Sequence, residues 1–198
     1  VYVGKDITID ELEKRHDAIL LALGSEHPFD FFSSSKGREL KGIHFAMDFL
    51  PQQNKRNFGE PLGKNFLDIS AKDKHVVVIG GGDTGSDCIG TSFRQGAKSV
   101  TQLEIMPRPP EKENKGLSWP NWPLKLRISS SQAEGAITKY SISTTGFSGE
   151  NGKVKKLHYV QVDEGMQPMA GTEGSFDADL VLLAMGFSGP VETDIVKQ

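Results

Sequence analysis

The sequence predicts an α/β domain that combines a parallel sheet with a β-hairpin. An unbroken apolar run, His75–Ile79, enters a glycine loop, as a strand covered on both faces of a parallel sheet does. A helical pattern over Asp83–Gln95, with Gly96 as its stop, and a second apolar run, Val100–Ile105, complete a strand–helix–strand unit of about 30 residues. This arrangement is typical of a Rossmann-like domain.

The hairpin follows further along the chain. Tyr140–Phe147 and Val154–Val162 alternate apolar and polar residues and flank Gly149-Glu150-Asn151-Gly152, which has the turn chemistry of a hairpin. A last apolar run, Leu180–Ala184, ends at Gly186 and predicts another buried strand.

The region before the glycine loop has weaker patterns. Ile7–Arg15 predicts a short surface helix, and the compact run Ala18–Leu23 predicts a buried strand that ends at Gly24. Ile43, Met47 and Leu50 lie at helical spacing, which predicts a helix that Pro51 stops. The polar stretch from Gln52 to Lys74 predicts a connector.

Composition narrows the class of protein. Hydrophobic residues make up 36% and charged residues 25%, and the formal net charge is -3, so no basic surplus points to nucleic acid or an anionic membrane. The single cysteine, Cys88, excludes a disulfide framework and a metal site built from several thiolates of this chain. No apolar run is long enough to cross a bilayer, and the first residues are not a signal peptide. We expect a cytoplasmic or organellar protein, not a secreted one, and a chain cut from a longer polypeptide, since it begins without Met.

The glycine loop, Gly80-Gly81-Gly82-Asp83-Thr84-Gly85, predicts a dinucleotide site. Its first glycine permits a tight turn, the second lets backbone amides approach a pyrophosphate, and the third lets the helix pack close to the strand. The phosphates would lie at the helix N-terminus near Asp83, where unpaired N–H groups and the helix dipole favour negative charge. Thr84 offers a hydroxyl donor. Asp83 would repel a phosphate, so we expect its side chain to cap the helix or point away. The alternative is an ordinary tight turn.

Glu104 and Arg108 favour different nucleotides. Glu104 follows Gly85 by 19 residues, near the place of the acid that binds an adenosine ribose, and this favours NADH over NADPH. Arg108 would pair with a 2′-phosphate if the loop folds back. The alternative for both is a solvated strand end.

Three further features are the loop after Ile105, the single cysteine and the histidines. The loop from Met106 to Pro123, the proline-rich loop, holds five prolines and two tryptophans. Its segment Trp119–Pro123 has three interpretations: a clamp over the nicotinamide, an interface with another domain, or a loop packed on its own core. Cys88 is expected to be a small buried side chain, not a nucleophile. The five histidines lack metal-ligand spacing and are expected to be structural or on the surface.

Four segments resemble the small chain of glutamate synthase, or the corresponding C-terminal region of the fused eukaryotic enzyme. They are Val76–Ser92, Gln102–Pro110, Trp119–Pro123 and Ala178–Phe187, and the similarity spans nearly the whole chain in the same order. The resemblance implies a flavoprotein with two interleaved dinucleotide-binding domains, in which a nicotinamide domain delivers a hydride to FAD in a flavin domain. Iron-sulfur clusters then pass electrons to the synthase (alpha) region, where glutamine-derived ammonia and 2-oxoglutarate become glutamate.

The resemblance also implies a division of the chain. Residues 1–24 would be a piece of the flavin domain, 25–74 a connector with a helix, 75–186 the nicotinamide domain, and 187–198 the return to the flavin domain. The turns Ala22–Gly24 and Ala184–Gly186 resemble the crossovers between the two domains, which adds Gly186 to the candidate cofactor-binding residues.

The chain lacks parts of the family's sequence, and this limits the cofactors that we expect it to bind. The flavin domain's own glycine loop would precede Val1, its closing contacts would follow Gln198, and the cluster-binding cysteines are absent, so we expect this chain to hold neither FAD nor an iron-sulfur cluster by itself. Fused relatives with a Leu-Glu strand end tend to use NADH. No catalytic residue is predicted, because hydride transfer depends on proximity and orientation. The alternatives are a related electron-transfer flavoprotein with another acceptor and a non-catalytic nucleotide-sensing or docking module.

Overall fold

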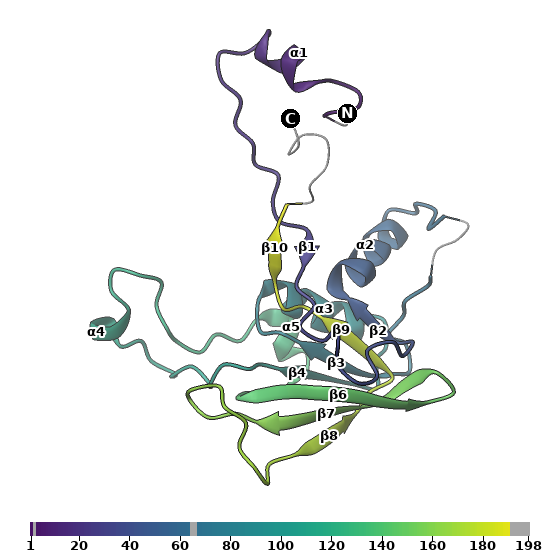
Figure 1. Ribbon diagram of the computed structural model, residues 1–198, viewed down its shortest axis with the longest axis vertical. Helices are drawn as coiled ribbons and strands as arrows, with labels where there is room; N and C mark the ends of the chain where they lie inside the picture. Colours follow the sequence, from purple (N-terminus) through teal and green to yellow (C-terminus); the bar gives the residue numbers. More distant parts are fainter. Residues whose placement is uncertain (2, 64–66, 191–198) are drawn as a thin grey trace. The chain divides into compact units, whose positions relative to one another are not determined.

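The computed structural model describes residues 1, 3–63 and 67–190 of the chain. The chain divides into two compact units, one made of Val1–Phe29 with the segment that begins at Phe187 and the other of Asp30–Gly186 (Figure 1). Residues 64–66 and 191–198 lie outside the described residues, so most of the expected return to a flavin domain at 187–198 does too.

The smaller unit holds one short helix and one pair of short strands among its described residues. Helix α1 (Ile9–Glu13) confirms the predicted surface helix, and it begins with a capping box in which Thr8 and Glu11 bond each other's backbone N–H groups. Strand β1 (His27–Pro28) pairs antiparallel with β10 (Phe187–Gly189).

The strand predicted at Ala18–Leu23 is wrong. These residues have no regular secondary structure, and the Leu20 side chain is 91% exposed. A strand needs a hydrogen-bonded neighbour, and the strand pairs of the described residues do not include this run. Apolar composition alone therefore did not make a strand here.

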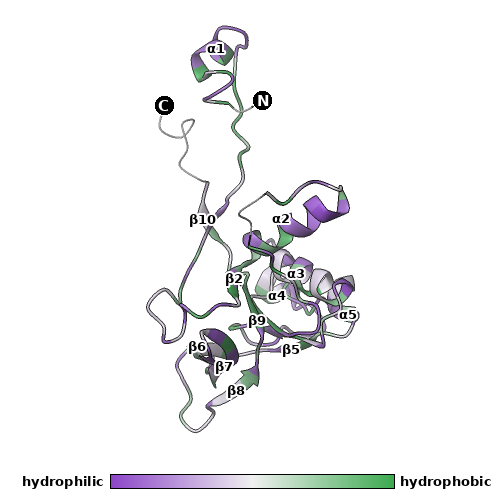
Figure 2. Ribbon diagram, turned by 90° about the vertical axis from the view of Figure 1, so that its right-hand side faces the viewer, coloured by the Kyte–Doolittle hydropathy of each residue, from purple (hydrophilic) through white to green (hydrophobic). Residues whose placement is uncertain are grey.

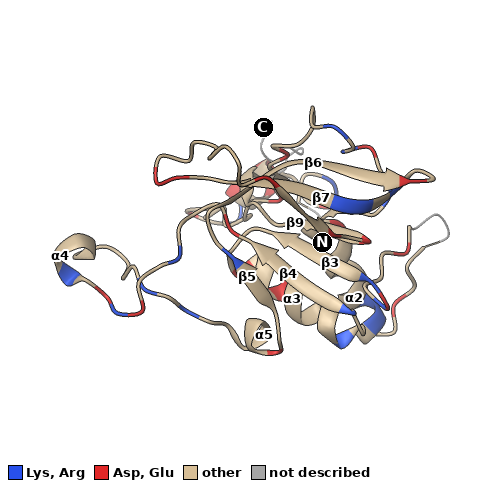
Figure 3. Cartoon of the chain, turned by 90° about the horizontal axis from the view of Figure 1, so that it is seen from below, with Lys and Arg blue, Asp and Glu red and all other residues tan. Residues whose placement is uncertain are grey.

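The larger unit is built on a five-stranded parallel sheet with the order β2-β9-β3-β4-β5. Its strands are β2 (Ile43–Phe45), β9 (Leu180–Leu183), β3 (His75–Ile79), β4 (Ser99–Leu103) and β5 (Ile137–Lys139). The predicted parallel sheet and the βαβ unit are confirmed. The central strands β3 and β4 carry no Lys, Arg, Asp or Glu (Figure 3).

Helices cover one face of this sheet, and a second sheet covers the other (Figures 1 and 2). The helices are α2 (Ala46–Asn57), α3 (Asp83–Arg94) and the short α5 (Ser130–Ala133). The second sheet is antiparallel and consists of β6 (Ile142–Glu150), β7 (Lys153–Gln161) and β8 (Gly174–Asp177). The unit thus has three layers and two apolar cores.

Strand β3 shows why its sequence is apolar throughout. Val76 and Val78 lie in the core beneath the helices, which also contains Ile89 of α3. Val77 and Ile79 lie in the core shared with the antiparallel sheet. Because both faces are buried, a run without alternation is favoured at this place.

The predicted hairpin is also confirmed. Strands β6 and β7 are joined by Asn151 and Gly152, whose φ angles are 51° and 71°. Positive φ at both turn residues is the geometry of a type I′ turn, which Asn-Gly favours. Gly149 and Glu150, expected in the turn, belong to β6 instead.

The region expected to be a connector is partly regular. Ile43, expected in the helix, lies in β2, and α2 continues through Pro51 to Asn57. Gln52 is buried in α2 and its side-chain amide bonds Leu67 O and Ile69 N, which ties the helix to the following chain. This contact is between residues 15 and 17 positions apart, so the local polar pattern did not predict it.

In the described part of the chain, no helix has the length and apolar character needed to cross a membrane.

Candidate functional site

The glycine loop lies at the carboxyl end of β3 and leads into α3. Gly80 has a φ of +123°, and a Cβ there would collide with the backbone carbonyl of Ala184 at the end of β9. A Cβ on Gly85 would lie 2.5 Å from Gly80 O. Gly82 differs, since a Cβ there would have no atom within 4 Å. Gly80 and Gly85 thus let the chain turn and pack closely, and Gly82 faces free space.

The N-terminus of α3 is free to bind an anion. Gly82 is the N-cap residue and has no side chain that could satisfy the first N–H groups of the helix. Of the two positions expected for the Asp83 side chain, capping the helix does not occur because Asp83 is the first helical residue, and pointing away agrees with its exposure. Unpaired N–H groups and the helix dipole there favour a phosphate group.

A hollow of about 800 Å³ lies beside this helix N-terminus. Gly81, Asp83 and Ser86 line one wall. The other wall comes from residues 106–110, which begin the proline-rich loop Met106–Pro123, and from residues 124–129, which follow that loop. These two segments are joined where Leu126 N donates to Pro110 O at 2.7 Å. The volume suits a ligand the size of a nucleotide.

Glu104 lies between the glycine loop and this hollow. It directly follows β4, and its backbone is fixed because Glu104 N donates to Lys139 O at 2.8 Å and Ile142 N donates to Glu104 O at 3.1 Å. Its Oε1 accepts a hydrogen bond from Met106 N at 3.1 Å, while Oε2 occupies the space that a Cβ on Gly81 would take. The structure therefore brings together the predicted ribose ligand and the predicted phosphate loop, two sequence regions about 20 residues apart.

Arg108 lines the same hollow. Its side chain is 57% exposed and forms an ion pair with Glu111 at 3.4 Å, a surface contact that contributes little stability. Glu104, which would repel a 2′-phosphate, and Arg108, which would pair with one, thus line the same hollow.

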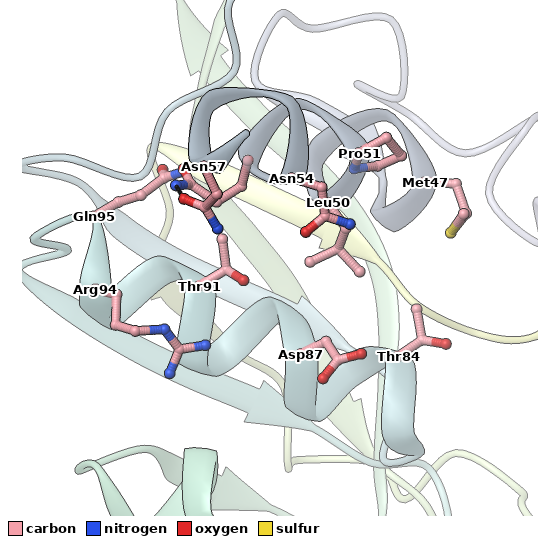
Figure 4. A pocket seen from close by; sticks show the side chains of 11 residues that line it. Met47, Leu50, Pro51, Asn54, Asn57, Thr84, Asp87, Thr91, Arg94 and Gln95 are labelled. Atoms are coloured by element: carbon pink, nitrogen blue, oxygen red, sulfur yellow. Dashed lines mark hydrogen bonds between the residues drawn. The ribbon is translucent and has the colours of Figure 1, made fainter. Parts of the chain in front are cut away.

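Thr84 and Gly186 do not line this hollow in the described residues. Thr84 faces a second hollow of about 700 Å³ between α2 and α3, where Figure 4 shows it near Asp87 on α3 and across from Leu50 and Met47 on α2. Gly186 ends the larger unit after β9 with a φ of +90°. The lining of the second hollow is largely polar amide and hydroxyl side chains, including Asn54, Asn57 and Gln95.

The proline-rich loop does not pack on its own core. It contains the short helix α4 (Lys115–Ser118) and extends away from the sheets (Figures 1 and 3). Trp119 and Trp122 are each 78% exposed, and the Arg127 guanidinium lies 4.6 Å from the Trp122 ring. This removes the third alternative for Trp119–Pro123, whereas the clamp and the interface stay predictions.

Cys88 and the histidines were not expected in the site. Cys88 is buried in α3, and burial raises the pKa of its thiol to about 12, so it stays protonated and inert. His75 and His158 bond the hydroxyls of Ser99 and Ser148. Burial lowers the pKa of His44. Among the described residues, no three His, Cys, Asp or Glu side chains could hold a metal ion.

Sequence reasoning missed two glutamines, Gln102 and Gln132, that line the hollow. Gln102 in β4 is completely buried and donates from Nε2 to Gly80 O at 2.9 Å. Its Oε1 accepts from Gln132 Nε2 at 2.7 Å and from Thr138 Oγ1 at 3.2 Å. The available signal was a Gln between Val100 and Leu103 of a predicted parallel strand, because buried polar groups must find partners.

The three-layered fold and the glycine loop define a class of protein. The chain matches the family described as pyridine nucleotide-disulphide oxidoreductase over residues 2–194, and it belongs to that family. Solved structures agree on the fold. Thioredoxin reductase of T. acidophilum has a TM-score of 0.54 and 17% identity, over 88% of this chain and 45% of that one. A FAD-dependent oxidoreductase of this family from Desulfovibrio vulgaris has a TM-score of 0.52 and 18% identity, over 89% and 37%.

Within this class, the chain is similar to glutamate synthases, which confirms the resemblance drawn from its motifs. The glutamate synthase (NADPH) small chain of Mycobacterium tuberculosis is 44% identical over 96% of this chain and 40% of its own length. The glutamate synthase (NADH) of Schizosaccharomyces pombe is 44% identical over 97% of this chain and 10% of its own length. The chain therefore spans less than half the length of these relatives.

Proposed function

We propose that this chain is the NAD(P)H-binding, electron-input part of a glutamate synthase, which passes a hydride from NADH, or less readily NADPH, to FAD. The observation that carries the proposal is the uncapped N-terminus of α3 with the Glu104 carboxylate beside Gly81. A dinucleotide needs both features, a site for its pyrophosphate and an acceptor for its ribose hydroxyls.

The residues fit a dinucleotide in four respects. The free space above Gly82 leaves room for the pyrophosphate, and the first turn of α3 supplies its N–H donors. Glu104 would accept hydrogen bonds from the adenosine ribose, and the hollow lined by residues 106–110 and 124–129 would take the adenosine. Asp83 is exposed at the edge of the same hollow and contributes no favourable contact to a phosphate.

The preference for NADH rests on charge. A carboxylate held against Gly81 repels a 2′-phosphate, whereas Arg108 is exposed and partly neutralised by its ion pair with Glu111. The names of the relatives support both nucleotides, since one is named for NADPH and the other for NADH.

The remaining parts of the reaction lie with other regions. The bound nicotinamide supplies the hydride, and this chain's residues bind and orient it, so we assign no acid or base. FAD would be held by the flavin domain of the full-length protein, of which residues 1–24 and 187–198 would be pieces. Iron-sulfur clusters and the synthase region would follow as partners. The sequence contains a single G-x-G-x-x-G loop, which supports one dinucleotide in this chain. We therefore expect the purified chain to show no flavin absorption.

Calorimetry on this chain tests the nucleotide. We expect NADH to bind more tightly than NADPH and Glu104→Ala to weaken NADH binding. Tighter NADPH binding that is lost in Arg108→Ala and unchanged in Glu104→Ala would reverse the assignment.

Stopped-flow spectroscopy on the full-length protein tests electron input. NADH should bleach the flavin absorption. Binding of NADH without flavin reduction would instead support the nucleotide-sensing module, and flavin reduction without glutamate formation would support a relative with another acceptor.

A further inference from the structure

The side-chain amides of Gln102 and Gln132 form a chain of hydrogen bonds that ends at the glycine loop. Gln102 Nε2 donates to Gly80 O at 2.9 Å, and Gln132 Nε2 donates to Gln102 Oε1 at 2.7 Å. Gln132 Oε1 in turn accepts from Ser129 N at 2.8 Å. Every oxygen in this chain faces a donor, so the orientation of both amides is determined by their neighbours.

The amide chain ends close to both walls of the nucleotide hollow. Gly80 precedes Gly81, which lines one wall, whereas Ser129 lines the other wall and caps α5. Gln102 and Gln132 come from different elements, and Thr138 Oγ1 of β5 adds a second donor to Gln102 Oε1 at 3.2 Å. The amide chain therefore links two segments that are about 50 residues apart in sequence.

Burying an amide is costly, which indicates what Gln102 contributes. It is 0% exposed and lies on the same side of β4 as Val100, which packs in the apolar core beneath the helices. An apolar residue would satisfy packing at such a position, whereas a buried amide is tolerated only because its hydrogen bonds are complete. The distinct contribution of Gln102 is thus the bond to the Gly80 carbonyl.

That bond fixes the plane of one peptide group. In a trans peptide the C=O and the following N–H point to opposite sides. Since Gly80 O points to Gln102, the N–H of Gly81 points away from Gln102. The bond from Gly80 N to Leu103 O, at 2.9 Å, holds the preceding peptide.

We infer that Gln102 and Gln132 are positioning residues for the dinucleotide: they set the direction of the Gly81 N–H and the separation of the two walls of the hollow. This inference rests on the proposed nucleotide binding and deepens it. Neither glutamine needs to contact the nucleotide for this effect.

The two substitutions that test the inference remove one donor each. Gln102→Met keeps the length and bulk of the side chain and loses the bond to Gly80 O. Gln132→Glu keeps the capping box at Ser129, since Glu accepts from the cap N–H as Gln does, but it loses the donor to Gln102. Gln52→Met is the matched control, because Gln52 is also a buried glutamine with several bonds but holds Leu67 and Ile69, away from the glycine loop.

Calorimetric titration of the chain with NADH is the first measurement, with thermal unfolding recorded for each variant. We expect the Kd to rise about tenfold in Gln102→Met, the effect of losing one well-placed hydrogen bond, and by a smaller factor in Gln132→Glu. The double variant should be no weaker than Gln102→Met, because both changes break one chain of bonds. Gln52→Met should lower the unfolding temperature and leave the Kd unchanged.

An unchanged Kd in Gln102→Met and Gln132→Glu would overturn the inference, and so would an equal rise in Gln52→Met. If Gln102→Met does not fold, Gln132→Glu still decides, since Gln132 is only partly buried.

NMR spectroscopy of the ligand-free chain separates this inference from the proposed function. Residual dipolar couplings report the direction of the Gly81 N–H, which should change in Gln102→Met and stay as in the unsubstituted chain in Gln52→Met. Failure of the unsubstituted chain to bind NADH or NADPH would refute the proposed function alone, whereas an unchanged direction of the Gly81 N–H in Gln102→Met would refute the positioning role alone.

Discussion

Two apolar runs of similar composition, Ala18–Leu23 and Leu180–Ala184, have opposite structures. The first has no regular secondary structure and leaves Leu20 91% exposed. The second forms β9, in which Leu182 is 0% exposed. Strand β9 pairs with β2 on one edge and β3 on the other, and its side chains enter the cores on both faces. The difference teaches that neighbours on both edges and both faces, rather than composition, make a run of this kind a strand.

Removing bulk from the buried run should have the largest effect. Leu182→Ala should lower the free energy of unfolding by about 3 kcal/mol, because it leaves a cavity in the core beneath the helices. Urea denaturation measures this value, and Leu23→Ala, in the exposed run, is the control. Equal losses in the two variants would mean that the runs are not distinguished by burial.

Ala184, which follows β9, leaves no room for a side chain at Gly80. A substitution at Gly80 should therefore have the next largest effect on stability. Gly80→Ala should cost about 2 kcal/mol, since it adds a collision with the Ala184 carbonyl to an unfavourable φ. Gly59→Ala is the control, because Gly59 also has a positive φ, +68°, but no atom within 4 Å of its added Cβ. If both variants lose the same stability, the contact between β9 and the loop contributes nothing.

The start of β9 should give a smaller effect that depends on pH. Burial would raise the pKa of Asp179, but hydrogen bonds from Lys155 and the His75 N–H outweigh it and lower the pKa below its usual value. A lowered pKa in the folded state adds stability above about pH 4 that is lost as the pH falls and the carboxylate is protonated.

Asp179→Ala should therefore lower the free energy of unfolding at pH 7 by about 1 kcal/mol and reduce the acid sensitivity between pH 5 and pH 2, because it removes the partly buried carboxylate that accepts from Lys155 and the His75 N–H. Urea denaturation across this pH range is the measurement. A variant with the same acid profile as the unsubstituted chain contradicts the role of Asp179.

Polar substitution in the exposed run should have the smallest effect. Leu20→Ser with Leu21→Ser should change the free energy of unfolding by less than about 0.5 kcal/mol, because neither side chain is buried in this chain. Hydrogen exchange should be fast at residues 18–23 and slow at residues 180–183. Slow exchange in the first run would show that it has a partner after all.

The site divides into a part that local sequence predicts and a part that it does not. The glycine loop was predictable because its residues are consecutive and each glycine has a separate steric reason. Glu104 was predictable because a strand–helix–strand unit has a nearly fixed length. The pair Gln102 and Gln132 was not, since β4, β5 and α5 must first assemble before their amides meet.

Local sequence did not determine which residues at the start of α3 face the nucleotide hollow. Thr84, within the glycine loop, lines the hollow between α2 and α3, whereas Ser86, just after the loop, lines the nucleotide hollow. Asp83 is one residue past the cap position, a difference that depends on where the helix begins.

The sequence by itself determined the elements whose residues act over short distances: the glycine loop, the Asn-Gly hairpin and the unbroken apolar strand β3. Steric limits on φ and the periodicity of side chains operate within a few residues, so such elements are visible in the printed sequence. Only the tertiary structure decided which of two apolar runs is buried, how α2 continues past Pro51, and which glutamines tie the glycine loop. These outcomes depend on partners far away in the chain, and burial and hydrogen bonding are properties of the assembled neighbours rather than of the segment.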